Sequence, residues 1–251
     1  MTGLLARKSS ASDALPAPGD GELHLWFCHL EQVASSEFFA REVLSRYAGV
    51  APADLRFVKG PCGKPALLFP QLSIAFNLSH SGNRMVLVIS GGCAVGVDLE
   101  YCDPARDVEK LARRFFSETE LRQLRACAGA GQLGRFYDYW TLKEAAIKAG
   151  GGSLGRELEA TTFDLSAAAG PTGERHPGGI TAHSPAVSGR AWFGLLQPIA
   201  NYRLAICCLA AADFSCGIRQ FVWPHLSPEA HPPRLLARSA ACDTTAGSGS
   251  L

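Results

Sequence analysis

Two carboxylates stand two residues apart in the apolar segment VGVDLE, residues 95–100. If this segment is a strand, the alternation of side chains places Asp98 and Glu100 on one face and Val97 and Leu99 on the other. Converging carboxylates are a hard-oxygen pair suited to Mg²⁺, which leaves its other positions to water and substrate phosphate. Taken alone, the pattern fits a solvated strand end better than a metal site.

A second group of chemical side chains lies in the segment WTLKEAAIK, residues 140–148. A helix places Trp140, Glu144 and Lys148 on one stripe, because residues four apart are neighbours, and Lys143 lies just beside it. As a surface pair, Glu144 and Lys148 would contribute only about 0.3–0.5 kcal/mol. The chain has only six lysines, however, and two of them flank this glutamate in an apolar setting. A third metal carboxylate, with an ammonium group for a phosphate or a proton transfer, would explain that combination.

The third group combines GKP, residues 63–65, with NLSHSG, residues 77–82. Small residues let backbone N–H groups approach an anion, Lys64 adds a point charge, and His80 can donate to a phosphate. Both stretches also resemble ordinary turns, and neither has the spacing of a Walker or Rossmann motif.

Charge is balanced over the whole chain but not along it. The net charge of +1 excludes non-specific attraction to nucleic acid or to anionic membranes. Residues 41–84 carry six basic and two acidic side chains. Residues 98–109 carry one basic and five acidic side chains, and residues 110–125 carry five basic and two acidic side chains. A phosphate zone, a metal zone and a second basic surface therefore follow one another.

Composition indicates a soluble globular protein. Of the 251 residues, 47% are hydrophobic, but the longest apolar run, residues 204–212, is shorter than the ~18–20 residues that cross a bilayer. The start of the chain lacks the apolar stretch of a signal peptide. Nine cysteines without CxxC spacing favour free thiols in a reducing cytoplasm.

Periodicity predicts strands, then helices, then strands again, which is typical of an α+β fold. Residues 1–20 and 223–251 are rich in Ser, Ala, Pro and Gly and are predicted to be disordered. Ser117 and Glu120 form a predicted capping box. The expected strands cover residues 23–30, 55–58, 74–78, 85–89, 93–99, 161–165, 190–197 and 202–209, and the expected helices cover 35–47, 108–116, 118–127 and 133–149.

Five of these segments, in this order and spacing, resemble the Sfp-type 4′-phosphopantetheinyl transferase family. They are GKP (63–65), FNLSHSG (76–82), VGVDLE (95–100), RRFFSETE (113–120) and WTLKEAAIKAGGGSL (140–154). The resemblance implies two similar α+β subdomains, here residues 21–102 and 103–222, which form a pseudo-dimer within one monomeric chain. It also implies Mg²⁺-dependent transfer of the phosphopantetheine arm of coenzyme A to a serine of an acyl or peptidyl carrier protein.

The resemblance also implies roles for individual residues. Asp98, Glu100 and Glu144 would hold Mg²⁺, and Glu120 lies where the family has a glutamate near the site. The general base stays open between Glu144, Lys148 and a metal-bound water. The residues expected to contact coenzyme A and its phosphates are Lys64, Asn77, Ser79, His80 and Lys143.

Two further expectations concern the surface. Residues 110–125 are the predicted docking surface for an acidic carrier, with Arg113, Arg122, Leu121 and Leu124 as contacts, although a solvated helix face fits them equally well. The family's basic stretch for the 3′-phosphate of coenzyme A is shortened here, and Arg41 and Arg46 are the candidates to replace it.

That departure keeps an alternative open: a non-catalytic protein that binds carrier proteins or nucleotides, with impaired coenzyme A binding. An unrelated Mg²⁺-dependent phosphotransferase is a second alternative. The pathway of the carrier, whether fatty acid, polyketide or nonribosomal peptide synthesis, is not determined by these residues.

Overall fold

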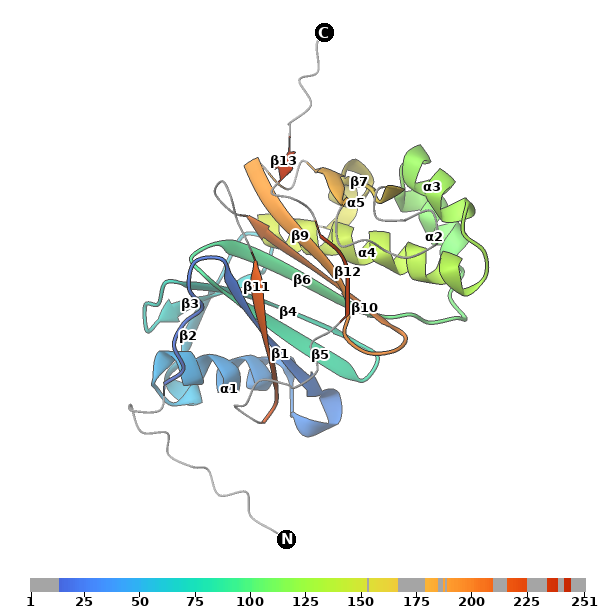
Figure 1. The fold of residues 1–251 in the computed structure, drawn as a ribbon. Helices are drawn as coiled ribbons and strands as arrows, with labels where there is room; N and C mark the ends of the chain where they lie inside the picture. Colours follow the sequence, from blue (N-terminus) through green and yellow to red (C-terminus); the bar gives the residue numbers. More distant parts are fainter. Residues whose placement is uncertain are drawn as a thin grey trace.

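The fold is α+β, as predicted, and consists of two sheets stacked between helices (Figure 1). The computed structural model describes residues 14–152, 154–166, 179–184, 187, 189–209, 216–224, 234–238 and 242–244. Among these residues, no helix has the length and apolar character needed to span a membrane.

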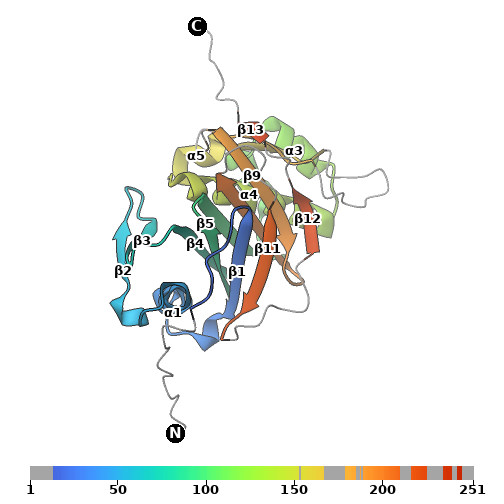
Figure 2. The same ribbon diagram turned by 60° about the vertical axis from the view of Figure 1, so that its left-hand side comes forward.

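The first half of the chain builds one sheet and a covering helix. Its elements are β1 (Glu22–His29), α1 (Ser36–Ala48), β2 (Arg56–Lys59), β3 (Pro65–Phe69), β4 (Ile74–Ser81) and β5 (Arg84–Gly91), with short 3-10 turns at Leu30–Gln32 and Pro52–Asp54. Ser35 caps α1 by accepting the Phe38 N–H, as a residue of this type does at a helix start. The β2–β3 hairpin lies beside α1 (Figure 2).

The second half carries most of the helices. Its elements are β6 (Ala94–Tyr101), α2 (Val108–Phe115), α3 (Glu118–Arg125), α4 (Ala130–Gly150), α5 (Leu154–Ala160), β7 (Thr162–Asp164), β8 (Thr181–His183), β9 (Gly189–Gln197), β10 (Tyr202–Leu209), β11 (Gly217–Val222), β12 (Arg234–Arg238) and β13 (Cys242–Thr244). The capping box of Ser117 and Glu120 is confirmed. The chain leaves α4 at Gly151, whose φ of 70° suits glycine.

The two halves repeat one topology. In the first, β1 is followed by a helix, a small hairpin and the pair β4–β5, and the sheet order is β1-β5-β4. In the second, β6 is followed by helices, the hairpin β7–β8 and the pair β9–β10, and the order is β6-β10-β9. Each opening strand pairs antiparallel with the last strand of its half. The topology therefore supports the predicted internal similarity.

Three apolar layers hold these elements together. One lies between α1 and the first sheet, one between the two sheets, and one between the second sheet and α4. Along β6, Val95, Val97 and Leu99 face the layer between the sheets. The intervening residues Gly96, Asp98 and Glu100 therefore point toward α4.

Long-range pairing changes the predicted subdomain limits. We assigned β6 to residues 21–102, but it is hydrogen-bonded to β10 and belongs to the second sheet. Conversely, β11 lies within residues 103–222 and pairs parallel with β1 in the first sheet. A strand joins the sheet whose free edge and apolar face it fits, whatever its position in the chain.

The predicted disordered ends are also corrected in part. From residue 14 the leader is ordered: the Leu15 N–H donates to the Arg46 carbonyl, and the Leu15 side chain packs on the α1 layer. In the predicted tail, β12 and β13 both pair with β9. Residues 1–13 and the rest of the tail beyond Pro224 lie outside the described residues.

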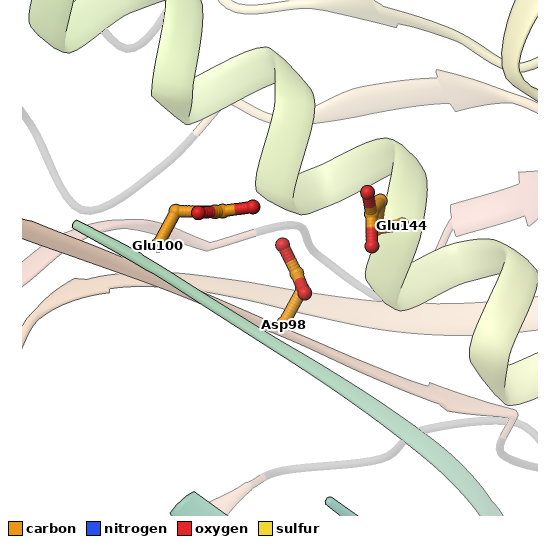
Figure 3. A group of neighbouring side chains, drawn as sticks. All are labelled: Asp98, Glu100 and Glu144. Carbon is orange, nitrogen blue, oxygen red and sulfur yellow. The ribbon is translucent and has the colours of Figure 1, made fainter. Parts of the chain in front are cut away.

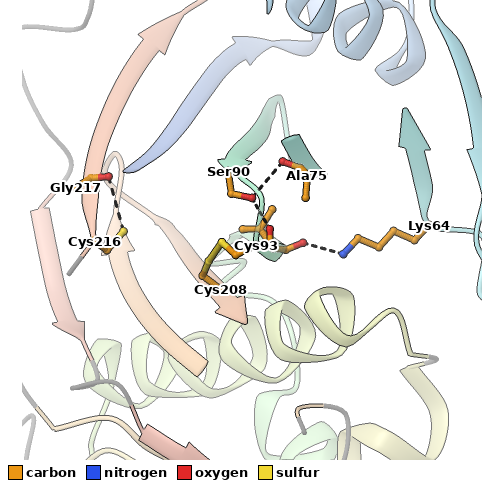
Figure 4. The surroundings of a disulfide bond; sticks show 8 residues. Lys64, Ala75, Ser90, Cys93, Cys208, Cys216 and Gly217 are labelled. Atoms are coloured by element: carbon orange, nitrogen blue, oxygen red, sulfur yellow. Dashed lines mark hydrogen bonds between the residues drawn. A yellow bond between two sulfur atoms is a disulfide. The ribbon is translucent and has the colours of Figure 1, made fainter. Parts of the chain in front are cut away.

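The prediction of free thiols is wrong for one pair of cysteines. Cys93, just before β6, and Cys208 of β10 form a disulfide with their Cα atoms 6.5 Å apart (Figure 4). Because Cys208 is in register with Val95, the antiparallel pairing brings the two cysteines together. The other cysteines whose side chains are described are free: Cys28, Cys62, Cys102, Cys127, Cys207 and Cys216.

The packing of α4 on β6 depends on Gly96. A Cβ atom at this position would overlap the backbone carbonyl oxygen of Ala145 and the backbone nitrogen of Ala149. Neither is a flexible side-chain end, so the helix itself would have to move. Gly96 is therefore what lets α4 lie close to the strand that carries Asp98.

We expect Gly96→Ala to lower the free energy of unfolding by about 1–3 kcal/mol, the usual cost of overpacking. Gly131→Ala in α4 is the control, because its Cβ would meet only ordinary contact with Cys127 and alanine favours a helix. Urea unfolding measures the free energy of unfolding of both variants. A Gly96→Ala protein as stable as Gly131→Ala would show that the close approach is not required.

Candidate active site

Three carboxylates meet between β6 and α4. Asp98 and Glu100 come from β6 and Glu144 comes from α4, and one ligand atom of each lies within 4.8 Å of the others (Figure 3). Asp98 is buried, and the other two are partly buried. The structure thus brings together the three predicted metal ligands, two by strand alternation and the third through the close packing of α4.

Lys148 lies against this cluster. Its Nζ donates to Asp98 Oδ1 at 2.6 Å and to Ser79 Oγ at 3.2 Å, and it lies 3.5 Å from Glu144 Oε2. Glu144 and Lys148 are one helical turn apart, so the predicted stripe of α4 faces Asp98.

The cluster holds more negative charge than one ammonium group balances. Burial, together with the charge of Asp98, raises the pKa of Glu144 to about 8. The same two causes raise the pKa of Glu100. Burial works to lower the pKa of Lys148, but Asp98 and Glu144 outweigh it and leave that pKa raised. The group therefore favours an additional positive charge.

The donor set fits a hard divalent cation. All three side chains offer carboxylate oxygens, the ligands that Mg²⁺ prefers. Within the described part of the chain, Asp98 Oδ2 is buried and accepts no hydrogen bond, and such an atom is costly unless something satisfies it. A metal ion held by Asp98, Glu100 and Glu144 would satisfy this oxygen atom.

Side chains of β4 hold the strand that carries the carboxylates. β4 and β6 are outer strands of their sheets. Asn77 Oδ1 accepts the Val97 N–H at 2.9 Å, Ser79 Oγ accepts the Leu99 N–H at 3.2 Å, and Ser81 Oγ accepts the Tyr101 N–H at 3.0 Å. The two serines also donate to the carboxylates, Ser79 to Asp98 at 2.9 Å and Ser81 to Glu100 at 2.7 Å.

This arrangement differs from the predicted nucleotide contacts. Asn77 and Ser79 are buried and bond within the protein, and Lys64 is bound to main-chain carbonyls. His80 is exposed at the end of β4 and stays a candidate ligand. Ser81 was not predicted. The alternation of polar residues in NLSHS was the signal for it, because a strand points Asn77, Ser79 and Ser81 to one side.

Lys143 and Glu120 lie outside the carboxylate cluster. Both side chains are fully buried, with Lys143 Nζ 2.9 Å from Glu120 Oε2. Lys143 also donates to the carbonyls of Phe115, Leu158 and Thr161. Lys143 therefore leaves α4 toward the other helices, and the pair joins α2, α3, α4 and α5. A helix turns 100° per residue, so Lys143 and Glu144 cannot share a face.

Arg41 and Arg46 are engaged by protein groups. The Arg41 guanidinium bonds Glu37 at 2.9 Å and the carbonyls of Pro52 and Leu55. Arg46 lies 4.8 Å from the centre of the Trp223 ring and donates to the Pro224 carbonyl. Both belong to α1, in the outer layer of the first half, and neither contacts the carboxylate cluster.

Two of the four residues of the predicted docking surface are exposed, and carrier docking itself stays a prediction. Arg113 and Arg122 are exposed, whereas Leu121 and Leu124 are buried in the layer around α4 and cannot offer an apolar contact. The two leucines lie three residues apart on α3, which is the spacing of its inward face. Arg113 forms an ion pair with Glu109, whose Oε1 lies 3.2 Å from Arg113 Nε.

A family comparison decides the identity of this arrangement. Residues 94–207, from β6 to β10, match the model of the 4′-phosphopantetheinyl transferase superfamily. The part of the chain that carries the carboxylate cluster is therefore similar to this superfamily. All three carboxylates and Lys148 lie within the matched residues, while β4 and the β2–β3 hairpin lie outside them.

Individual relatives agree with this assignment. The chain is 35% identical to the 4′-phosphopantetheinyl transferase HetI of Nostoc sp. over 115 residues, 45% of this chain and 48% of HetI. It is 36% identical to Sfp of Bacillus subtilis over 107 residues, 42% of this chain and 46% of Sfp. Each match thus spans about half the length of the relative. Another B. subtilis 4′-phosphopantetheinyl transferase is 28% identical over 191 residues, 76% of this chain and 79% of that protein.

We expect metal binding to release a proton from this superfamily site at neutral pH. Because the pKa of Glu144 is raised to about 8, its carboxyl group is largely protonated at pH 7, and a metal requires the carboxylate. Affinity for Mn²⁺ should therefore rise between about pH 6 and pH 8 and then level off. Titration calorimetry in two buffers of different ionisation enthalpy measures how many protons are released when Mn²⁺ binds. Glu144→Gln, which has no proton to lose, is the control, and an affinity that does not change with pH would contradict the prediction.

We expect Lys143→Met to destabilise the fold by about 3–5 kcal/mol, because it leaves Glu120 buried and unpaired. The double variant Lys143→Met/Glu120→Gln removes that charge, keeps the side-chain shape and one of the two oxygens that accept the Ser117 and Phe163 N–H groups, and should regain part of the loss. Lys110→Met, at an exposed position of α2, is the control. Urea unfolding decides the question: a Lys143→Met protein as stable as Lys110→Met would mean that the buried pair is dispensable.

Proposed function

We propose that this chain transfers the 4′-phosphopantetheine arm of coenzyme A to a serine of an acyl or peptidyl carrier protein. The observation that carries the proposal is the cluster of Asp98, Glu100, Glu144 and Lys148 within the superfamily match. In this reaction the serine oxygen forms a bond to the phosphorus that bears the arm. The bond from that phosphorus to the adenosine side breaks, and adenosine 3′,5′-bisphosphate leaves.

Mg²⁺, when bound by Asp98, Glu100 and Glu144, would supply Lewis-acid neutralisation of the pyrophosphate charge. Lys148 adds a second positive charge at the same place, and its raised pKa keeps it protonated at neutral pH. It therefore binds phosphate oxygens better than it accepts a proton. The contacts of Lys148 with Ser79 and Asp98 hold the ammonium group in position before substrate arrives.

Glu144 is the group best suited to take the serine proton. A general base must lie within hydrogen-bond reach of the proton that it takes, and Glu144 lies in the cluster that would hold the reacting phosphate. Its carboxylate has two oxygens, so holding a metal does not exclude accepting a proton. Glu120, with no exposed surface and Lys143 as its partner, takes no part in the chemistry.

The carrier would approach over α2 and α3, where Arg113 and Arg122 are exposed. Carrier docking would then rest on charge there, since Leu121 and Leu124 are buried. The chain would act as a monomer, because both halves of the pseudo-dimer are present in it.

A non-catalytic binding protein is the second candidate. It is favoured by Arg41 and Arg46, the expected ligands of the 3′-phosphate, which are already bound by protein groups. Such a protein would bind carrier without modifying it.

The decisive experiment incubates the protein with an apo carrier, coenzyme A and Mg²⁺ and measures the carrier mass. We expect a gain of one phosphopantetheine arm, and a rate reduced at least ~100-fold by Asp98→Asn or Glu144→Gln, because each removes a charge at the reacting phosphate. Glu159→Gln, an exposed carboxylate on α5, is the control and should keep full rate. If none of a panel of carriers gains mass, the result would favour the non-catalytic binding protein. If the Asp98 and Glu144 variants modify the carrier at the wild-type rate, the proposed active site would be refuted.

A further inference from the structure

Lys64, in the turn between β2 and β3, reaches away from its own hairpin to two distant elements. Its Nζ donates to the Val95 carbonyl at 2.9 Å, to the Lys148 carbonyl at 2.6 Å and to the Ala149 carbonyl at 3.4 Å. Figure 4 shows the side chain extended toward the start of β6, near Cys93. Val95 is the second residue of β6, the strand of Asp98 and Glu100, and Lys148 lies in the last turn of α4, the helix of Glu144. One ammonium group therefore connects both ligand-bearing elements.

The Val95 contact extends the series made by β4. Residues 95, 97, 99 and 101 alternate along β6, and each has a main-chain group bonded to a side chain of the first half: Lys64, Asn77, Ser79 and Ser81 in turn. Lys64 is the member of this series that also binds main-chain groups of α4. It does so at the point where Gly96 lets the helix lie closest to the strand.

The contacts suit an ammonium group and use it fully. An ammonium group has three N–H donors and no acceptor, and here it meets three carbonyl oxygens. Two of them belong to the last turn of α4, where the helix dipole presents negative charge that a cation stabilises. Burial lowers the pKa of Lys64, but the carbonyls satisfy its donors. A phosphate could be bound by Lys64 only if these contacts were broken.

We propose that Lys64 is a positioning residue: it fixes the last turn of α4 against β6, and so sets the distance from Glu144 and Lys148 to Asp98. This inference rests on the proposed function for its kinetic consequence. Its structural part, the geometry of the carboxylate cluster, is independent of any reaction. In this role Lys64 acts through Lys148 and Glu144, and coenzyme A does not touch its ammonium group.

The test compares Lys64→Met with Lys59→Met, an exposed lysine of the same hairpin, at a temperature where both are folded. We expect Lys64→Met to weaken Mn²⁺ binding about tenfold, the lower end of the effect of groups that orient metal ligands. It should lower kcat for carrier modification by a similar factor and leave the KM for coenzyme A unchanged. Lys59→Met should match the wild type in all three measurements.

Opposite results overturn the proposal. A raised KM for coenzyme A with unchanged kcat and Mn²⁺ affinity would make Lys64 a substrate ligand. A lowered melting temperature with Mn²⁺ affinity and kcat unchanged would make it a stabilising residue only. If the wild type modifies no carrier, the proposed function fails, while Mn²⁺ binding still tests Lys64.

If Lys64→Met does not fold, Lys64→Arg and Lys64→Gln replace it. Arginine keeps the positive charge and can donate to several carbonyls, so it should retain Mn²⁺ affinity near the wild-type value. Glutamine keeps two N–H donors but has no positive charge, so the Lys64→Gln variant should bind Mn²⁺ several-fold more weakly. Equal Mn²⁺ affinity of the glutamine variant and the wild type would overturn the proposal.

Discussion

The outer edge of β6 has main-chain groups that β10 does not bind, and side chains of the first half of the chain satisfy them. An unpaired buried N–H or carbonyl group costs about as much as a lost hydrogen bond, so this edge must be covered for the two sheets to stack. Asn77, Ser79 and Ser81 cover the N–H groups, and Lys64 covers one carbonyl. Because Ser79 and Ser81 also donate to Asp98 and Glu100, the bonds that join the halves also orient the carboxylates.

The helix α4 divides its polar residues between structure and chemistry. Glu144 and Lys148 face β6, where Gly96 lets the helix lie close, and they complete a cluster that favours added positive charge. Lys143, one residue from Glu144, points the other way and binds Glu120 in a fully buried pair. One face of the helix is thus held by a satisfied ion pair, and the other keeps an unsatisfied excess of carboxylate.

The superfamily match covers α4 and the strands β6, β9 and most of β10, but not the first half of the chain. The topology repeats between the halves, yet only the second carries the carboxylates and the basic helices. The first half contributes the β4 side chains, Lys64 and exposed His80. Arg41 and Arg46 stabilise α1 and its surroundings instead of adding charge to the cluster. Under the proposed function, other groups would therefore bind the nucleotide end of coenzyme A.

The sequence by itself determined what depends on neighbours a few residues away: the shared face of Asp98 and Glu100, the stripe of Glu144 and Lys148, and the caps at Ser35 and Ser117. These follow from strand alternation and helix spacing, which act within one element. Only the tertiary structure decided that Lys143 is buried, that Lys64 binds a carbonyl 84 positions away, that Cys93 meets Cys208, and that β11 pairs with β1. Those outcomes depend on which edges and faces cover one another after folding, and local periodicity carries no information about that.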